Sequence, residues 1–159
     1  MSVDPFEQVA KPFTEMPWVK FLGIEMTRSD PGEVTLRVDP APEHLNQNGT
    51  VNAPVMFGLA EAAGAAAVVM GFLDLLGMTY SVVRHVEMDF VAAARGPIEA
   101  TGRLPAEEVE RVRAEVEQGR SVDIEIPVVV TDSSGRTVAT INEVMAIRAL
   151  RDGAAGATS

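Results

Sequence analysis

Glu61 is the residue whose type and surroundings most strongly suggest chemistry. It is the only charged residue between Leu45 and Leu73. A buried carboxylate is costly unless it is paired, protonated or open to a cleft. Burial also raises the pKa of such a group toward the range that suits a general base or acid. The alternatives are a glutamate hydrogen-bonded at a subunit interface, or one whose carboxylate reaches solvent.

The start of the apolar segment around Glu61 is a second candidate feature. Residues 53–73 predict a long helix, with Asn52 as its N-cap, Pro54 in its first turn and Gly77 at its end. A helix N-terminus offers free N–H groups and the positive end of a dipole. Asn52 and Glu61 are about 13 Å apart along such a helix and half a revolution around it. One helix therefore cannot present both to one substrate, whereas two helices side by side in a dimer could.

The same segment is long enough to cross a membrane. A lone central acid opposes insertion by roughly 2.5 kcal/mol or more, and a helix that is apolar all round is equally typical of a protein core. We therefore expect a buried core helix and no membrane partner. Small residues would let a curved sheet come close to this helix: Gly58, Ala62, Gly64, Ala65 and Ala66.

The segment His44-Leu45-Asn46-Gln47-Asn48-Gly49-Thr50-Val51-Asn52-Ala53-Pro54, followed by Leu59-Ala60-Glu61, matches a known pattern. It resembles the active-site segment of hotdog-fold acyl-CoA thioesterases, above all the phenylacetate-degradation-type branch. That family carries H-x-N-x-x-G-x-x-H-G-G-x-x-x-x-L-x-D/E at the same spacing. His44, Asn46, Gly49, Leu59 and Glu61 occupy its marked positions. The resemblance covers about residues 20–150, and an inserted helix at 105–118 is similar to a less characterised branch of the superfamily.

The resemblance implies an α+β hotdog fold, in which a curved antiparallel sheet wraps a long central helix. It also implies a homodimer or a dimer of dimers (a homotetramer) with a site shared between subunits. The substrate would be an acyl-CoA thioester, with coenzyme A as part of the substrate and no further cofactor. By the match, Ala53 N–H would stabilise the oxyanion, Glu61 of the facing protomer would activate water or attack directly, and the Asn46 amide would hold the carbonyl or the water.

Four positions depart from the family pattern. Asn52 replaces a histidine, Ala53 and Pro54 replace two glycines, and Val83 stands where some members have Ser or Thr. These changes would suit a non-catalytic acyl-group-binding or sensing module, which is the alternative function. A hotdog hydratase or dehydratase is a further alternative, but it would need a His and Asp pair, and the long helix supplies no histidine.

The remaining polar candidates are fewer. His44 and His85 are the only histidines and there is no cysteine, so the sequence predicts no metal site. His44 is expected to shape the loop of the site. Arg95 resembles a basic residue near the nucleotide end of coenzyme A, and Arg84, beside His85 on a predicted strand, is a second candidate for the phosphates.

The composition limits the partners. The chain of 159 residues has 13 Lys+Arg and 23 Asp+Glu, a formal net charge of −10. That balance opposes nucleic acid and anionic membranes as partners. It also means that polyanionic coenzyme A must find local cations. Without cysteines or a leader pattern in residues 1–20, we expect a cytoplasmic protein. Glu61 is the one acid set apart, and the other 22 are expected on the surface.

The elements that must position these residues follow from periodicity. Residues 1–152 are expected to form a single domain, with a disordered tail at 153–159. The order is a short helix and turn within 5–21, two strands, the long helix, and then four strands with a charged amphipathic helix inserted among them. The predicted strands span residues 22–27, 33–38, 79–91, 98–104, 121–131 and 137–150. One central helix against a mainly antiparallel sheet is an α+β plan.

Overall fold

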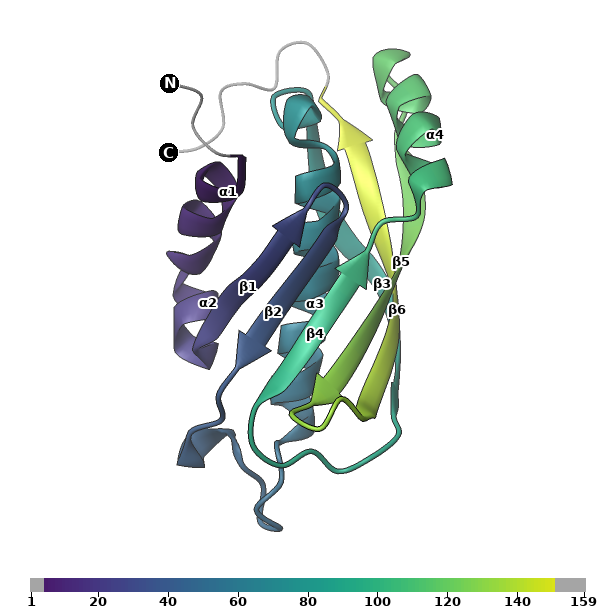
Figure 1. Cartoon of the computed structure of the whole chain (residues 1–159). Helices are drawn as coiled ribbons and strands as arrows, with labels where there is room; N and C mark the ends of the chain where they lie inside the picture. Colours follow the sequence, from purple (N-terminus) through teal and green to yellow (C-terminus); the bar gives the residue numbers. More distant parts are fainter. Residues whose placement is uncertain (1–4, 151–159) are drawn as a thin grey trace.

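The computed structural model describes residues 5–150, which form a six-stranded sheet with a long helix on one face (Figure 1). This is the α+β plan that the sequence predicts. The helices are α1 (Pro5–Thr14), α2 (Pro17–Leu22), α3 (Ala53–Gly71) and α4 (Ala106–Glu117). The strands are β1 (Ile24–Asp30), β2 (Glu33–Val38), β3 (Thr79–Phe90), β4 (Ile98–Arg103), β5 (Val122–Asp132) and β6 (Thr137–Ala149).

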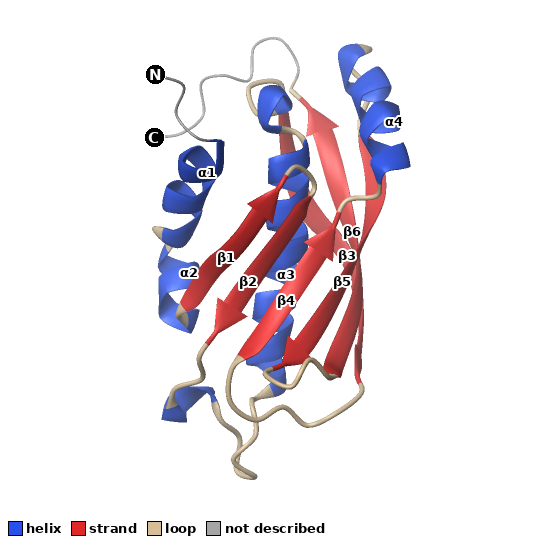
Figure 2. Ribbon diagram, viewed as in Figure 1, coloured by secondary structure: helices blue, strands red, loops and turns tan. Residues whose placement is uncertain are grey.

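The sheet has the strand order β1-β2-β4-β5-β6-β3, and each neighbouring pair is antiparallel (Figure 2). Its two edges differ. At one edge, α1 and α2 contact β1. At the other edge, β3 pairs with β6 on one side, and among residues 5–150 no strand pairs with its other side. The backbone of a strand twelve residues long is therefore open to pairing there.

Helix α3 is the centre of the core. Nearly all of its surface is apolar, and it packs mainly on β2, β4 and β5. The approach is close, because a Cβ on Gly102 of β4 would lie 2.5 Å from the Ala63 carbonyl oxygen. The helix is long and apolar enough to span a membrane, but 67% of its most apolar stretch is buried inside the protein. It is therefore the core helix that the sequence predicts.

The ends of two elements differ from the sequence prediction. Helix α3 ends at Gly71, six residues before Gly77, because Phe72 leaves helical geometry and a short 3₁₀ helix follows at Leu73–Leu75. The N-terminal region contains two helices in place of one helix and a turn. Pro17 begins the second, and Gly23, with a left-handed φ of 63°, ends it. The predicted tail at 153–159 lies outside the described residues.

Helix α4 is inserted between β4 and β5, as predicted. Val112 and Val116 on its apolar face are buried, and Arg113 donates hydrogen bonds to Asp74, which follows α3. The insertion thus packs on the body of the protein at the end of α3 far from Ala53.

The prediction that every acid other than Glu61 lies on the surface is wrong for Glu143. This residue is on β6 in the same phase as Ile141 and Met145, so its side chain points toward α3. Its exposed fraction is 0%. The core therefore contains a carboxyl group that the composition alone could not reveal.

Candidate active site

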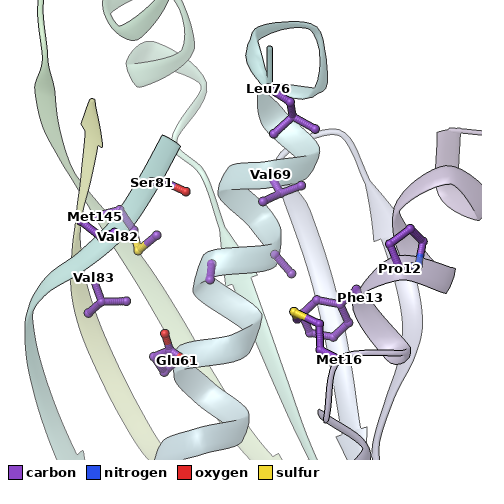
Figure 3. Close-up of a pocket in the computed structure, with 12 residues that line it drawn as sticks. Pro12, Phe13, Met16, Glu61, Val69, Leu76, Ser81, Val82, Val83 and Met145 are labelled. Carbon is purple, nitrogen blue, oxygen red and sulfur yellow. The ribbon is translucent and has the colours of Figure 1, made fainter. Parts of the chain in front are cut away.

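Glu61 lies at an apolar cavity of about 710 Å³. Figure 3 shows the residues of α3 between Ser81, Val82 and Val83 of β3 on one side and Pro12, Phe13 and Met16 on the other. Except for Glu61 and Ser81, the side chains that line this cavity are apolar. Glu61 is half-buried, and this burial raises the pKa of its carboxyl group.

A second carboxyl group, that of Glu143, is buried close to this cavity and does not line it. Neither side-chain oxygen of Glu143 has a hydrogen-bond partner among the described residues. A Cβ built on Gly64 would lie 2.2 Å from Glu143 Oε2, so the absence of a side chain at Gly64 makes room for this carboxyl group. Burial, and then the charge of Glu61, raise the pKa of Glu143 to about 8. Glu143 is therefore protonated at neutral pH.

Neither acid has a basic partner in the part of the chain that the structure describes. None of the ion pairs found within residues 5–150 includes Glu61 or Glu143. The same part of the chain contains no group of three or more His, Asp or Glu side chains arranged to hold a metal ion. The two carboxyl groups thus act on each other in an environment of low polarity.

The start of α3 borders a different cavity, of about 290 Å³, which is lined by Asn46, Ala53 and seven other residues. Among the described residues, no group accepts a hydrogen bond from Ala53 N–H. Asn52 is at the N-cap position, as predicted, and its carbonyl accepts hydrogen bonds from Val55 and Met56. Its side chain makes no capping bond. Ala53 N–H is therefore available to an acceptor in this cavity.

Asn46 organises the loop before α3. Its Oδ1 accepts hydrogen bonds from the N–H groups of Asn48 (2.9 Å) and Thr50 (3.2 Å), and its Nδ2 donates to Thr50 Oγ1 (2.8 Å). Gly49 completes this tight turn with a left-handed φ of 67°. One Nδ2–H of Asn46 remains for a ligand in the cavity that Asn46 and Ala53 both line.

His44 and Arg95 fix the position of the same loop. His44 is buried, its Nδ1 accepts a hydrogen bond from Ala41 N–H (3.1 Å), and its carbonyl accepts one from Asn52 N–H (2.8 Å). Arg95 donates to the carbonyls of Gly49 (3.0 Å) and Asn48 (3.3 Å). Both residues thus hold the backbone that leads into α3.

Arg84 lies apart from this loop. It is at an irregularity in the β3–β6 pairing, between Val83 and His85, and its Nε is 3.0 Å from Asp123 Oδ2. Asp123 alternates with the buried Ile124 along β5, which places the ion pair on the face of the sheet opposite α3.

Within one chain, the predicted residues therefore form two groups. Asn46 and Ala53 border one cavity, and Glu61 borders another. This separation agrees with the half revolution between Asn52 and Glu61 that helical geometry requires. Sequence reasoning missed Glu143, although the pattern Ile141-x-Glu143-x-Met145 on a predicted strand contained the signal.

Comparison with solved structures places this architecture among hotdog-fold proteins. A Pseudomonas aeruginosa protein of unknown function, described as a probable thioesterase, is 26% identical with a TM-score of 0.81, over 94% of this chain and 99% of that chain. The PaaI protein of the E. coli phenylacetic acid degradation operon is 17% identical with a TM-score of 0.71, over 92% and 94%. A mutant thioesterase from P. aeruginosa is 16% identical with a TM-score of 0.72, over 94% and 97%.

These structural neighbours are a probable thioesterase, a PaaI protein and a thioesterase, and they share the hotdog fold. Residues 8–147 match the model of a domain of unknown function, DUF4442. The chain therefore belongs to the DUF4442 family, and its fold is the hotdog fold that the sequence resemblance implies. No curated protein matches the chain.

Proposed function

We propose that this protein hydrolyses acyl-CoA thioesters. Glu61 takes a proton from water, and the water oxygen attacks the thioester carbonyl carbon. The carbonyl oxygen becomes an oxyanion that accepts a hydrogen bond from Ala53 N–H. The carbon–sulfur bond then breaks, and the coenzyme A thiolate receives the proton from Glu61. The products are a free acid and the coenzyme A thiol. Direct attack by the Glu61 carboxylate is the second route to the same products.

The observation that carries this proposal is the position of Glu61 at an otherwise apolar cavity. A carboxylate in such a place is poorly solvated and has a raised pKa, which makes it a stronger base than a surface glutamate. The cavity has the chemistry of an acyl-chain site because its lining is almost entirely apolar. The 26% identical neighbour from Pseudomonas aeruginosa, a probable thioesterase, supports the same reaction.

The proposed catalytic site is shared between two copies of the chain. Glu61 of one protomer would act with Asn46 and the Ala53 N–H of the other, since these groups border separate cavities within one chain. The open edge of β3 supports self-association, because Tyr80, Val82 and Phe90 are about half exposed there. A homodimer, or a dimer of dimers, would cover these side chains.

The nucleotide end of coenzyme A needs cations on an acidic protein. Arg95 is the better candidate, because it is exposed and lies next to the loop that leads to Ala53. Arg84 is the second candidate, although it is paired with Asp123. His44 and Gly49 would support the site through the loop backbone. The protein would need no cofactor beyond the coenzyme A of its substrate and would work in the cytoplasm.

A non-catalytic acyl-CoA-binding module is the second candidate function. Pro54 favours it, because a second N–H donor is lost where the family has glycine. Most hydrogen bonds of the Asn46 amide are made within its own loop, which leaves one N–H for a substrate. Such a module would bind acyl-CoA in the same cavities and release it unchanged.

The test is hydrolysis of a panel of acyl-CoA thioesters, from short to long and including aromatic acyl groups. Wild type is compared with Glu61→Gln, and with Glu125→Gln on the exposed side of β5 as the matched control. We expect Glu61→Gln to lower kcat by about 10²–10⁴-fold and the control to match wild type. Hydrolysis that survives Glu61→Gln unchanged would exclude the role of Glu61. Binding without turnover of any thioester would favour the binding module.

A further inference from the structure

Glu143 is a buried acid that the proposed reaction does not use. Its side chain has an exposed fraction of 0%, and both of its carboxyl oxygens lack a partner among the described residues. Leaving a buried polar group unpaired is unfavourable for folding. An apolar residue at this position of β6 would avoid that cost, as Ile141 and Met145 do two residues to either side.

The location of Glu143 connects it to Glu61. The carboxyl group of Glu143 packs against Gly64, whose missing side chain makes room for it. Gly64 follows Glu61 by three residues, so the two positions are neighbours on one side of α3. Glu143 thus lies against the same turn of the helix that carries Glu61.

The other described elements around Glu143 contribute no positive charge. Its register partners are Ile126 of β5 and Val86 of β3, and Val128 of β5 also packs against Gly64. Within residues 5–150, Glu61 of α3 is the one charged group that acts on Glu143. The two acids therefore influence each other without a cation between them.

Two neighbouring carboxyl groups in a medium of low polarity cannot both ionise easily, and they share one proton over a range of pH. Glu61 is half-buried and opens into the cavity, whereas Glu143 is enclosed. Glu61 consequently ionises first, and its charge, together with burial, raises the pKa of Glu143 to about 8.

We propose that Glu143 is a positioning residue that holds the shared proton, so that the pair carries one negative charge and that charge is located on Glu61. This inference rests on the proposed thioester hydrolysis for its role in catalysis. The neutral Glu143 gives Glu61 a polar neighbour without a counter-charge, which leaves Glu61 both ionised and basic near neutral pH. Ionisation of Glu143 would place a second charge beside Glu61 and end this arrangement.

The first test is the pH dependence of kcat for wild type, Glu143→Gln and Glu143→Leu, with Glu125→Gln as the control. Wild type and the control should lose activity above about pH 8, with a fall approaching tenfold for each further pH unit. Glu143→Gln cannot ionise, so this alkaline fall should be absent. Glu143→Leu removes the polar neighbour, so the acid limb of its profile should move to higher pH. Profiles identical to wild type in both variants would overturn the proposal.

The second test does not depend on activity. Carboxyl resonances of protein labelled with ¹³C-glutamate are followed by NMR as the pH is raised, in wild type, Glu143→Gln and Glu61→Gln. We expect one carboxyl group that titrates near pH 8, that is missing in Glu143→Gln, and that titrates at lower pH in Glu61→Gln. If no thioester is hydrolysed but this pattern appears, the coupled pair stands and the proposed function fails. A Glu143 titration that Glu61→Gln leaves in place contradicts the inference.

Discussion

Acidic residues on the two faces of the sheet have opposite environments. On the outer face, Asp123 of β5 is 3.0 Å from Arg84 and 2.9 Å from Arg148. On the inner face, Glu143 of the adjacent strand β6 has no hydrogen-bond partner within residues 5–150, and its charged neighbour there is another acid, Glu61. Strands β5 and β6 are neighbours in the sheet. The environments of the two acids therefore differ because their side chains lie on opposite faces of it.

The difference in environment decides whether an acidic side chain only forms surface ion pairs or has a raised proton affinity. A partly exposed acid next to arginines contributes little to stability, about 0–1 kcal/mol. An acid without a cation in an apolar region costs stability, but its proton affinity is raised. Glu61 and Glu143 therefore have the properties of functional groups. Asp123 and its two arginines have those of a surface ion-pair network.

The largest expected effect concerns stability as a function of pH. The ordinary pKa of the Glu143 carboxyl is 4.5 and its folded value is about 8, so between these values the native state binds more protons than the unfolded state. The free energy of unfolding of wild type should fall relative to Glu143→Gln by about 1.4 kcal/mol per pH unit across that window. Urea unfolding from pH 4.5 to 9 measures it. Parallel curves for the two proteins would mean that Glu143 is not buried as a neutral acid.

A cation introduced on the inner face should give Glu61 the kind of partner that Asp123 has on the outer face. Val83 lines the cavity with Glu61 and is 36% exposed, so Val83→Lys places an ammonium group where it can pair with Glu61. The pair should lower the pKa of Glu61 and reduce kcat by about 10–100-fold. Val83→Met, which has a long uncharged side chain, is the matched control. Equal activity of the two variants, both with the wild-type oligomeric state, would show that the charge of Glu61 does not matter.

A side chain added at Gly64 of α3 would fill the space that the Glu143 carboxyl group occupies. In Gly64→Ala the new Cβ meets Glu143 Oε2 at 2.2 Å and Val128 Cγ2 at 3.3 Å. We expect a loss of about 1–3 kcal/mol in the free energy of unfolding from overpacking. Gly77→Ala, at a position with nothing within 4 Å, should change stability by no more than about 0.5 kcal/mol. Equal stability of the two variants would mean that Glu143 moves away from Gly64 at no cost.

The smallest effect is expected on the outer face. Asp123→Asn removes the partner of Arg84 and Arg148, both of which have substantial contact with water. The free energy of unfolding should fall by less than about 1 kcal/mol. A loss as large as that of Gly64→Ala would erase the contrast between the two faces.

The elements of the fold could be predicted because the strongest patterns of the sequence are local, and the hotdog arrangement was expected from the family resemblance. The apolar run around Glu61 and the alternation in β2, β5 and β6 predict the core helix and most of the sheet. The end of α3 could not be predicted, because residues 72–77 contain no strong breaker before Gly77. The helix ends early where the chain turns into the short 3₁₀ helix at Leu73–Leu75.

The candidate site was only partly accessible to sequence reasoning. Glu61 stands out because the residues around it in the chain are apolar. Glu143 is less evident, because its spacing from Ile141 and Met145 places it on the inward side of β6 but does not show that the acid is fully buried beside α3. Its burial comes from Gly64, 79 positions earlier in the sequence, and only the packing of the helix on the sheet brings the two together.

The central claim is that hydrolysis needs Glu61 of one protomer and Ala53 N–H of the other. Ala53→Pro removes that N–H at a helix position that tolerates proline, and the extended backbone of Asn52, with ψ of 140°, already suits a following proline. Ala53→Gly, which keeps the N–H, is the control. We expect Ala53→Pro to lower kcat by about 10²–10³-fold.

The decisive measurement is acyl-CoA hydrolysis by mixed dimers of Ala53→Pro and Glu61→Gln, co-expressed with different tags. Each variant alone should be nearly inactive. In random dimers, half are mixed and each mixed dimer has one intact site, so activity should return to about a quarter of wild type. A mixture as inactive as its components would contradict the shared site.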